Sequence, residues 1–370
     1  MRRLSTGRRS GTGCVGLAFE GDCVRMVQMR QQRGDLHVAG AARVELDEPV
    51  SDPDRRRQRL AEQLRAAVVS GGFLGRQCVI SLPREEVHVQ AVRLPDMPDA
   101  ELREAAAWEA ADRLNLAREE IECDVLRTGA PIDAKSRHEV LVVAAARSSL
   151  EPRLQSVIDA GLRPVAVDTH FGGVARALSR RQRRDSDDQV RGVLEVGDAG
   201  STMMVLRGAD VAFCKVLPIG GRHLDEHVAE RLDQDVDAVR ALRLAMLDQD
   251  GPGVDATTEG AVRDAARGVI AELARDTMLC LRHFAVSARG GSPDRLLLTG
   301  VHAAEQGLAS CLTETCRMTV HLDDECASTG ALATGLSRVL PASSGPASGW
   351  TAVAGLSLRG LERINRRRAA

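Results

Sequence analysis

The stretch GVLEVGDAGSTMMVL, residues 192–206, decides the fold of this chain. It consists of an apolar strand, a turn rich in glycine and short polar residues, and a second apolar strand, a pattern that predicts a β-hairpin. The stretch CVGLAFEGDCVRMVQM, residues 14–29, repeats this plan near the start of the chain. Aligning the two hairpins places Ala18 opposite Glu195, a shift of 177 residues (195 − 18). Such a repeated unit predicts two homologous lobes.

The segments around the two hairpins read as alternating strands and helices, which predicts an α/β protein. In the first half, strands are expected at 36–44, 78–83, 87–91, 140–146 and 164–170, and helices at 52–71, 99–115 and 150–160. In the second half, strands are expected at 211–218 and 294–300, and helices between 224 and 284, broken at 250–253, and at 350–358. Trp108 is interpreted as a packing residue, and the charge-dense stretch 179–188 as a solvated linker.

The overall composition is that of a soluble globular protein with two or three domains. The chain has 370 residues, of which 44% are hydrophobic and 28% charged, and a formal net charge of −2. This composition excludes collagen-like, disordered and membrane-embedded chains, and nucleic acid is not an expected partner. The longest apolar run, residues 140–146, is far shorter than the ~18 residues that span a bilayer. The nine cysteines lack any C-x-x-C spacing. Neither a disulfide framework nor a zinc ribbon is therefore expected, and the location is expected to be a reducing cytoplasm.

The two glycine-rich turns form the candidate functional site. Backbone N–H groups and short hydroxyls in such turns can bind phosphate, and nearby carboxylates can hold a hydrated Mg²⁺. Glycine matters there because a Cβ atom would hold the phosphate away. Two such turns facing each other from homologous lobes, with a third glycine turn at Gly300, predict a clamp for a triphosphate. This arrangement resembles that of the actin-like ATPase superfamily.

A closer resemblance, over residues 13–360, is to the type IV pilus assembly protein PilM family, which is related to the cell-division protein FtsA. It rests on stretches that stand in family order, among them VISLPREEVHVQAVRLPDMPDAEL, AGLRPVAVD, GVLEVGDAGSTMMVL, VLPIGGRHLDEHVA, DRLLLTGV and GLSLRG. The resemblance implies an actin-like (ribonuclease H-like) two-lobed α/β fold with an inserted small α/β subdomain. The implied parts are a disordered basic leader at 1–12, a first lobe at 13–83 and 148–188 with a returning helix at 345–362, an inserted subdomain at 84–147, and a second lobe at 189–344 with a helical insertion at about 224–290.

The nucleotide positions of the family carry over only in part. Members usually read G-I-D-I-G-S-S-S-V-K at the first turn, where residues 16–25 read GLAFEGDCVR. The Asp that helps to organise Mg²⁺ is Ala18 here, and Arg25 replaces the phosphate-pairing Lys. The third turn, typically G-G-G, reads Gly300-Val301-His302, whose side chains would crowd a purine. The implied nucleotide-contacting positions are Gly21, Asp22, Cys23, Arg25, Glu195, Gly197, Gly200, Ser201, Thr202, Gly220, Gly221 and Gly300.

Phosphoryl transfer depends on a positioned metal, so the missing carboxylate argues against catalysis, and binding of ATP with Mg²⁺ is expected to be weak or lost. The resemblance then implies a non-enzymatic cytoplasmic adaptor of a type IV pilus or type II-like secretion platform at the inner membrane. Such an adaptor would bind the N-terminal cytoplasmic peptide of a PilN-like membrane protein between the first lobe and the inserted subdomain, partly through residues 87–115. An active actin-like ATPase and an FtsA-like polymerising membrane tether stay open as alternatives, as does self-association.

Three other groups of residues have patterns that resemble functional sites. His223 and His227 are spaced like a metal pair, but no third ligand is visible, so an exposed helix face is the preferred interpretation. Asp168 and His170 lie near a strand end and are assigned a structural role. The basic tail at 363–368 follows apolar residues and resembles a short amphipathic membrane contact, although a frayed terminus is preferred.

Overall fold

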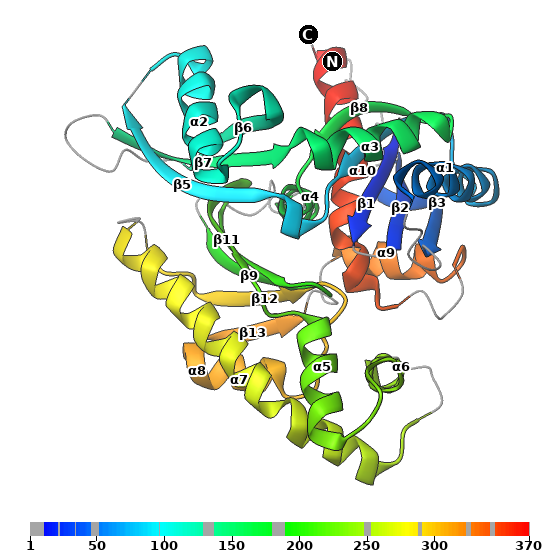
Figure 1. Ribbon diagram of the computed structural model, residues 1–370, viewed down its shortest axis with the longest axis vertical. Coiled ribbons are helices and arrows are strands. Elements are labelled where there is room, and N and C mark those ends of the chain that lie inside the picture. Colours follow the sequence, from blue (N-terminus) through cyan, green and yellow to red (C-terminus); the bar gives the residue numbers. More distant parts are fainter. Residues whose placement is uncertain are drawn as a thin grey trace, which may run out of the picture. The chain divides into compact units, whose positions relative to one another are not determined.

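A computed structural model describes residues 11–20, 23–33, 35–45, 52–95, 97–128, 137–179, 189–247, 253–287, 291–322, 327–340 and 345–369. The chain divides into two compact units. The first unit comprises Met1–Ser81, Arg153–Leu178 and Cys326–Ala370, and the second comprises Leu82–Pro152 and Ser179–Glu325. Figure 1 labels their helices and strands.

The first unit is built on a five-stranded sheet in the order β3-β2-β1-β4-β8. Strands β1, β2 and β3 form antiparallel pairs, whereas β4 and β8 run parallel to β1. The strand bounds are β1 Gly11–Glu20, β2 Cys23–Gln32, β3 Asp35–Glu45, β4 Gln77–Ser81 and β8 Arg163–Asp168. β1 and β2 are almost continuously buried, as expected of strands with both faces covered.

Helices cover this sheet, and α10 is packed most closely against it. Figure 1 shows α10 (Thr351–Ala369) running beside β1, and the two share a hydrophobic cluster that includes Trp350 and Leu356. Asp52 caps α1 (Pro53–Ser70), since its carboxylate accepts hydrogen bonds from the backbone N–H groups of Asp54 and Arg55. The remaining helices are α3 (Arg147–Asp159), whose first residues belong to the second unit, α4 (His170–Ser179) and α9 (Ala327–Leu336).

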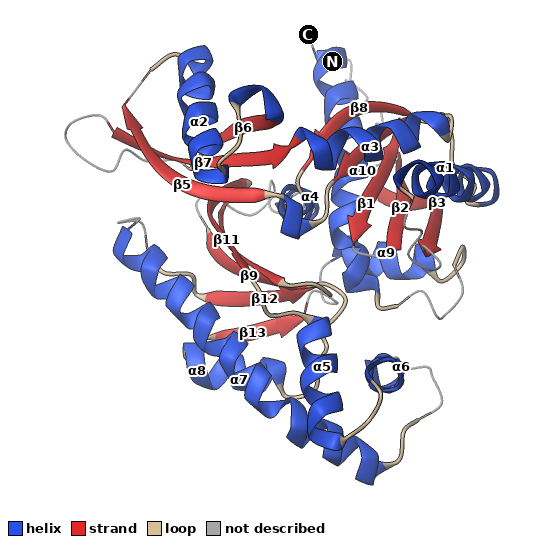
Figure 2. Ribbon diagram, viewed as in Figure 1, coloured by secondary structure: helices blue, strands red, loops and turns tan. Residues whose placement is uncertain are grey.

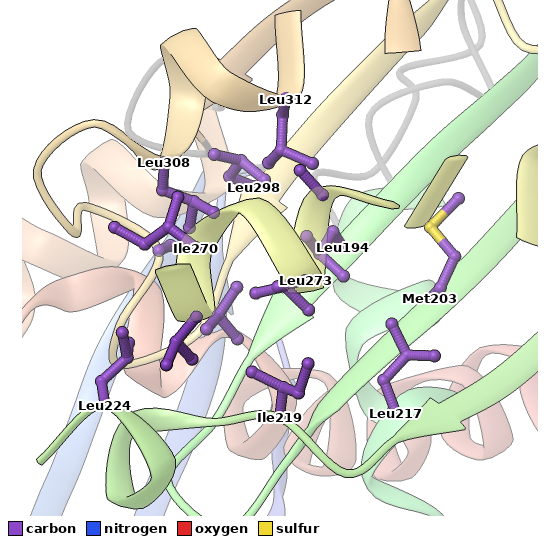
Figure 3. Close-up of a cluster of buried hydrophobic side chains, with 14 of the residues drawn as sticks. Leu194, Met203, Leu217, Ile219, Leu224, Ile270, Leu273, Leu298, Leu308 and Leu312 are labelled. Carbon is purple, nitrogen blue, oxygen red and sulfur yellow. The ribbon is translucent and has the colours of Figure 1, made fainter. Parts of the chain in front are cut away.

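The second unit contains a sheet in the order β11-β10-β9-β12-β13. Its strands are β9 Val190–Val196, β10 Ser201–Arg207, β11 Asp210–Leu217, β12 Arg295–Thr299 and β13 Thr319–Leu322. Its helices are α5 Gly221–Leu232, α6 Val236–Leu247, α7 Ala256–Ser287 and α8 Leu308–Cys316. Leu194, Leu273 and Leu312 belong to one buried cluster that joins the sheet to these helices, as Figure 3 shows.

The two five-stranded sheets repeat one pairing scheme. Ala18 pairs with Arg25 in the first hairpin, and Glu195 pairs with Thr202 in the second. Both members of the pair are shifted by the same 177 residues (195 − 18 and 202 − 25). In each sheet the first strand also has a parallel neighbour, β4 for β1 and β12 for β9. The predicted duplication is confirmed at the level of strand register.

A third sheet, in the order β5-β7-β6, lies within the second compact unit (Figure 2). It consists of β5 (His88–Pro95), β6 (Ile121–Arg127) and β7 (Arg137–Ala146), and α2 (Asp99–Leu114) packs against it. Two short 3₁₀ turns, η1 (Arg84–Glu86) and η2 (Arg118–Glu120), flank these elements. This segment is the small α/β part expected at 84–147, whose status as a subdomain inserted in the first lobe stays a prediction.

Several local expectations differ from the structure. The side chain of Trp108 is 59% exposed, so its interpretation as a packing residue is wrong. It falls on the outer face of α2, while the small alanines of that helix face the sheet. β1 begins at Gly11, inside the expected leader, and α10 continues to Ala369, beyond the closing helix expected at 350–358. Within the described part of the chain, no helix is long and apolar enough to cross a membrane.

Glycines in two helices give opposite predictions for alanine substitution. A Cβ atom on Gly355 of α10 would overlap the backbone oxygen of Gly173 in α4, whereas a Cβ on Gly260 of α7 meets nothing within 4 Å. We expect Gly355→Ala to lower the free energy of unfolding by about 2 kcal/mol or more. Gly260→Ala is expected to raise it by about 0.5–1 kcal/mol, because alanine favours a helix.

Urea unfolding followed by circular dichroism measures both changes. Equal effects of the two substitutions would show that the close packing of α10 on α4 does not limit stability.

Candidate functional site

The first turn connects β1 to β2 and is centred on a buried ion pair. Glu20, at the end of β1, pairs with Arg25 of β2, and the side chain of Arg25 is only 5% exposed. The Arg25 guanidinium also lies 5.8 Å from the ring centroid of Trp350. Arg25, which the resemblance assigns to phosphate, is therefore paired with a carboxylate of its own turn. Nε2 of His170 lies 3.8 Å from the Glu20 carboxylate, so this histidine adjoins the turn.

The first turn has no carboxylate at position 18, where the resemblance leads us to expect an Asp that helps to organise Mg²⁺. Ala18 is fully buried and lies between Arg25 on β2 and Ser81 on β4. Cys23 begins β2 and is half-buried, whereas Gly21 and Asp22 lie outside the described residues. Asp168 accepts hydrogen bonds from Arg176 (2.9 Å) and Arg359 (2.5 Å), so its carboxylate links α4 and α10 to the end of β8.

The second turn connects β9 to β10, and the groups predicted to bind phosphate are engaged within the protein. The backbone N–H of Gly197 donates to the carbonyl of Gly200 at 3.0 Å. The hydroxyl of Ser201 donates to the carbonyl of Ile219 at 2.6 Å. The hydroxyl of Thr202 accepts a hydrogen bond from Nη1 of Arg84 at 2.9 Å. Gly197 and Ser201 thus donate hydrogen bonds within the protein, whereas the Thr202 hydroxyl accepts one from Arg84.

Glu195, to which the resemblance assigns a role in metal binding, pairs with Arg84. Nη2 of Arg84 donates to Oε1 of Glu195 at 3.0 Å, and the two side chains are 10% and 3% exposed. The guanidinium lies against Gly197, since a Cβ atom there would stand only 2.7 Å from Cζ of Arg84. Nothing in the sequence points to Arg84. An arginine exposed in a surface turn and an arginine that binds a carboxylate 111 residues away look the same in a sequence.

The predicted glycines at 220 and 221 pack against the second turn. A Cβ atom on Gly220 would come within 2.5 Å of the backbone of Asp198 and Gly200. The N–H of Gly221, at the start of α5, donates to the carbonyl of Gly197 at 2.9 Å. The face of Gly221 is covered by the imidazole of His302, because a Cβ atom there would overlap the ring.

The third glycine turn is closed by a backbone contact and by His302. Gly300 has a φ of +101°, and a Cβ atom on it would overlap the carbonyl oxygen of Val196, so this position requires glycine. His302 is 2% exposed, and its Nε2 lies 3.6 Å from the Asp198 carboxylate. Burial raises the pKa of Asp198, but the hydrogen bond from His302 and the charges of Arg240 and Arg222 outweigh it and lower the pKa to about 2.

A buried arginine, Arg243, lies next to Gly221 and to the segment that follows the third glycine turn. The guanidinium of Arg243 is 1% exposed and pairs with the carboxylates of Asp225 and Glu305, the latter at 2.6 Å. It also donates to the carbonyl of Gly221 at 3.0 Å. Burial raises the pKa of Asp225, although the charge of Arg243 opposes this effect. The sequence could not predict this cluster, because its residues come from three separate segments: α5, α6 and the loop before α8.

The residues present do not fit a magnesium-bound triphosphate. The first turn has Ala18 in place of a carboxylate, and Glu195 of the second turn is neutralised by Arg84. The side chain of His302 fills the space at Gly221. Among the residues that the structure describes, no three His, Cys, Asp or Glu side chains gather as a metal site. His223 is exposed and His227 half-buried on α5, while Asp225 between them points into the core.

Comparisons with known proteins identify the fold and the family. The family model described as type IV pilus assembly protein PilM matches residues 16–359. The solved structure of the PilM–PilN type IV pilus biogenesis complex has a TM-score of 0.75 and 22% identity, and the match covers 94% of this chain and 98% of that one. No curated protein sequence matches the chain.

Two further structures share the fold at low identity. The ethanolamine utilization protein EutJ of Carboxydothermus hydrogenoformans has a TM-score of 0.53 and 14% identity, with 94% of this chain and 89% of that one covered. MreB5 of Spiroplasma citri, bound to ADP, has a TM-score of 0.50 and 7% identity, with 96% and 99% covered. These matches, the repeated sheets and the family model agree with the expected two-lobed actin-like α/β fold. The chain therefore belongs to the type IV pilus assembly protein PilM family.

Proposed function

We propose that this protein is a non-enzymatic adaptor of a type IV pilus or type II-like secretion platform, placed in the cytoplasm against the inner membrane by its partner. The partner is a PilN-like membrane protein, which the chain binds through that protein's N-terminal cytoplasmic peptide. Membership of the PilM family and the likeness to a PilM chain solved with PilN support this role.

The observation that carries the absence of catalysis is the buried Ala18 at the metal-organising position of the first turn. A methyl group supplies no oxygen to a metal, and phosphoryl transfer needs a positioned metal to neutralise the phosphate charge. The engaged donors of the second turn and the imidazole over Gly221 support a degenerate nucleotide site as well.

We assign one side of the peptide site to the segment 87–115, and the exposed Trp108 of α2 is its anchor. Tryptophan is enriched among the residues that dominate binding energy, because its large rigid surface loses little entropy on docking. Glu104 and Asp112, one helical turn before and after Trp108, are also exposed. Glu104 is paired with Arg118 at 3.4 Å, so an apolar peptide side chain with one basic neighbour, facing Asp112, suits this face of α2.

The fluorescence of Trp108 tests the partner directly. The chain has two tryptophans, and Trp350 is only 1% exposed, so a change in emission on titration reports on Trp108. We expect the N-terminal cytoplasmic peptide of the PilN-like protein from the same genome to shift the emission to shorter wavelength, because docking removes water from the indole.

The matched variants for this titration are Trp108→Ala and Leu279→Ala, followed by calorimetry. Leu279 is similarly exposed, at 56%, but lies on α7. We expect Trp108→Ala to weaken peptide binding by about tenfold or more and Leu279→Ala to leave it unchanged. A peptide that does not bind the wild-type protein would overturn the adaptor role. Unchanged binding by Trp108→Ala would overturn only the assigned contact.

Nucleotide use is tested by titrating the purified protein with Mg-ATP in a calorimeter and by measuring phosphate release. We expect no binding in the micromolar range and no turnover, because Ala18 offers no oxygen to a metal and Glu195 is paired with Arg84. A peptide titration on the same preparation confirms that the protein is folded. Micromolar affinity or sustained phosphate release would favour the active ATPase instead.

The contact between Asp198 and His302 predicts a pH dependence of stability. Because the pKa of Asp198 is lowered to about 2 in the folded protein, its ionised form stabilises the fold above about pH 4, and this contribution is lost as the pH falls towards 2. Asp198→Asn should lower the free energy of unfolding by about 1–2 kcal/mol at pH 7.

Urea unfolding of Asp198→Asn and wild type between pH 7 and pH 3 measures this dependence. The two proteins should converge as the pH falls. Asp124→Asn is the control. Because Asp124 is exposed, this substitution should change the free energy of unfolding little at any pH. A difference between Asp198→Asn and wild type that is constant over the range would show that Asp198 stabilises the turn by shape rather than by charge.

A further inference from the structure

The second turn holds a positive charge that comes from a distant part of the chain. Arg84 opens η1, directly after Pro83, and its backbone is fixed there by hydrogen bonds from the N–H groups of Glu86 to Pro83 (3.1 Å) and of Val87 to Arg84 (3.2 Å). The side chain extends from this rigid turn to β9 and β10. Its position is therefore set at both ends.

The guanidinium makes two directed hydrogen bonds, one with a carboxylate and one with a hydroxyl. Nη2 donates to Glu195 at 3.0 Å and Nη1 donates to Thr202 at 2.9 Å. These two acceptors face each other across the β9–β10 pair, since Glu195 and Thr202 are register partners. A planar fork with parallel N–H groups suits two acceptors held side by side, which a lysine ammonium would satisfy less well.

Burial makes this pairing necessary. The Glu195 side chain is 3% exposed, and an ionised carboxylate at that depth is strongly destabilising without a cation. A bound metal with its phosphate could meet this need, but Arg84 meets it from within the chain. Gly197 allows the arrangement, because any larger residue there would collide with the guanidinium.

We propose that Arg84 is the resident cation of the second turn, where its guanidinium takes the place of a magnesium–polyphosphate ligand and keeps the turn closed to such ligands. This inference rests on the proposed loss of nucleotide use and adds the residue that enforces it. The turn is then structurally complete without any ligand. Arg84 also fastens the start of the segment at 84–147 to β9 and β10, so this connection is independent of nucleotide.

A double-mutant cycle, measured by urea unfolding, tests the pairing of Arg84 with Glu195. Arg84→Ala, Glu195→Gln and the double variant are compared with Arg93→Ala, whose arginine is 56% exposed and lies 3.7 Å from Glu139. Arg84→Ala should raise the unfolding equilibrium constant about 100-fold, because it leaves Glu195 buried without its cation, and Arg93→Ala should raise it less than about threefold.

The unfolding equilibrium constant of the double variant should be at least about tenfold smaller than the two single increases multiplied together would give. This difference corresponds to a coupling free energy of about 1.4 kcal/mol. If Arg84→Ala does not fold, a folded double variant supports the pairing equally well. Additive effects, or an Arg84→Ala protein as stable as Arg93→Ala, would overturn it.

Magnesium pyrophosphate tests the closure of the turn through its effect on the melting temperature. We expect no shift in the wild type, a rise in Arg84→Ala and in Arg84→Gln, and no rise in the double variant, because Glu195 is then missing as a metal ligand. Arg84→Gln keeps a hydrogen-bonding side chain without the charge, so it supplies a folded protein if alanine is not tolerated.

An unchanged melting temperature in both single variants would overturn the role of Arg84 in closing the turn, and so would a wild-type shift of the same size. The adaptor role is decided separately by the peptide titration on the wild-type protein. Arg84 variants that show none of these effects, together with intact peptide binding by the wild type, would therefore refute this inference alone.

Discussion

The register of two antiparallel hairpins is the constraint on which the rest of the structure depends. Each hairpin is flanked by a parallel strand, so its first strand is central in its sheet and buried on both faces. A slip of one residue would turn every side chain to the opposite face. The register therefore fixes which residues meet at the end of each strand: Ala18 with Arg25, and Glu195 with Thr202.

In both turns, a charged side chain with little exposure to solvent is paired with a side chain of opposite charge. In the first turn, Arg25 pairs with Glu20 of the same hairpin, whereas in the second, Glu195 pairs with Arg84 from η1. The second turn also holds Asp198, which is surrounded by His302 of the third glycine turn and by two arginines. In both turns the protein neutralises these charges with side chains of its own.

Much of the fold follows from local patterns, and the candidate site follows only in part. Glycine-rich turns between apolar strands predict both hairpins, and the identical shift between them predicts the duplication. The sequence marks Gly300 only as a third glycine turn, and the structure adds that its positive φ and close approach to Val196 exclude a side chain. The exposure of Trp108 does not follow from the sequence, because α2 packs on its sheet with alanines and a helix rich in alanine does not reveal which side is buried.

The sequence by itself determined the twin hairpins and most of the strand and helix order, though not β6, α4 or α9, because these features depend on residue type and short-range spacing. The resemblance to the PilM family added that Ala18 stands where a carboxylate is expected. Only the tertiary structure decided that Arg84 reaches Glu195, that His302 covers Gly221, and that Arg243 lies buried between Asp225 and Glu305. These contacts join residues far apart in the chain. A long charged side chain can reach many acceptors, so its partner is set by packing and burial rather than by local sequence.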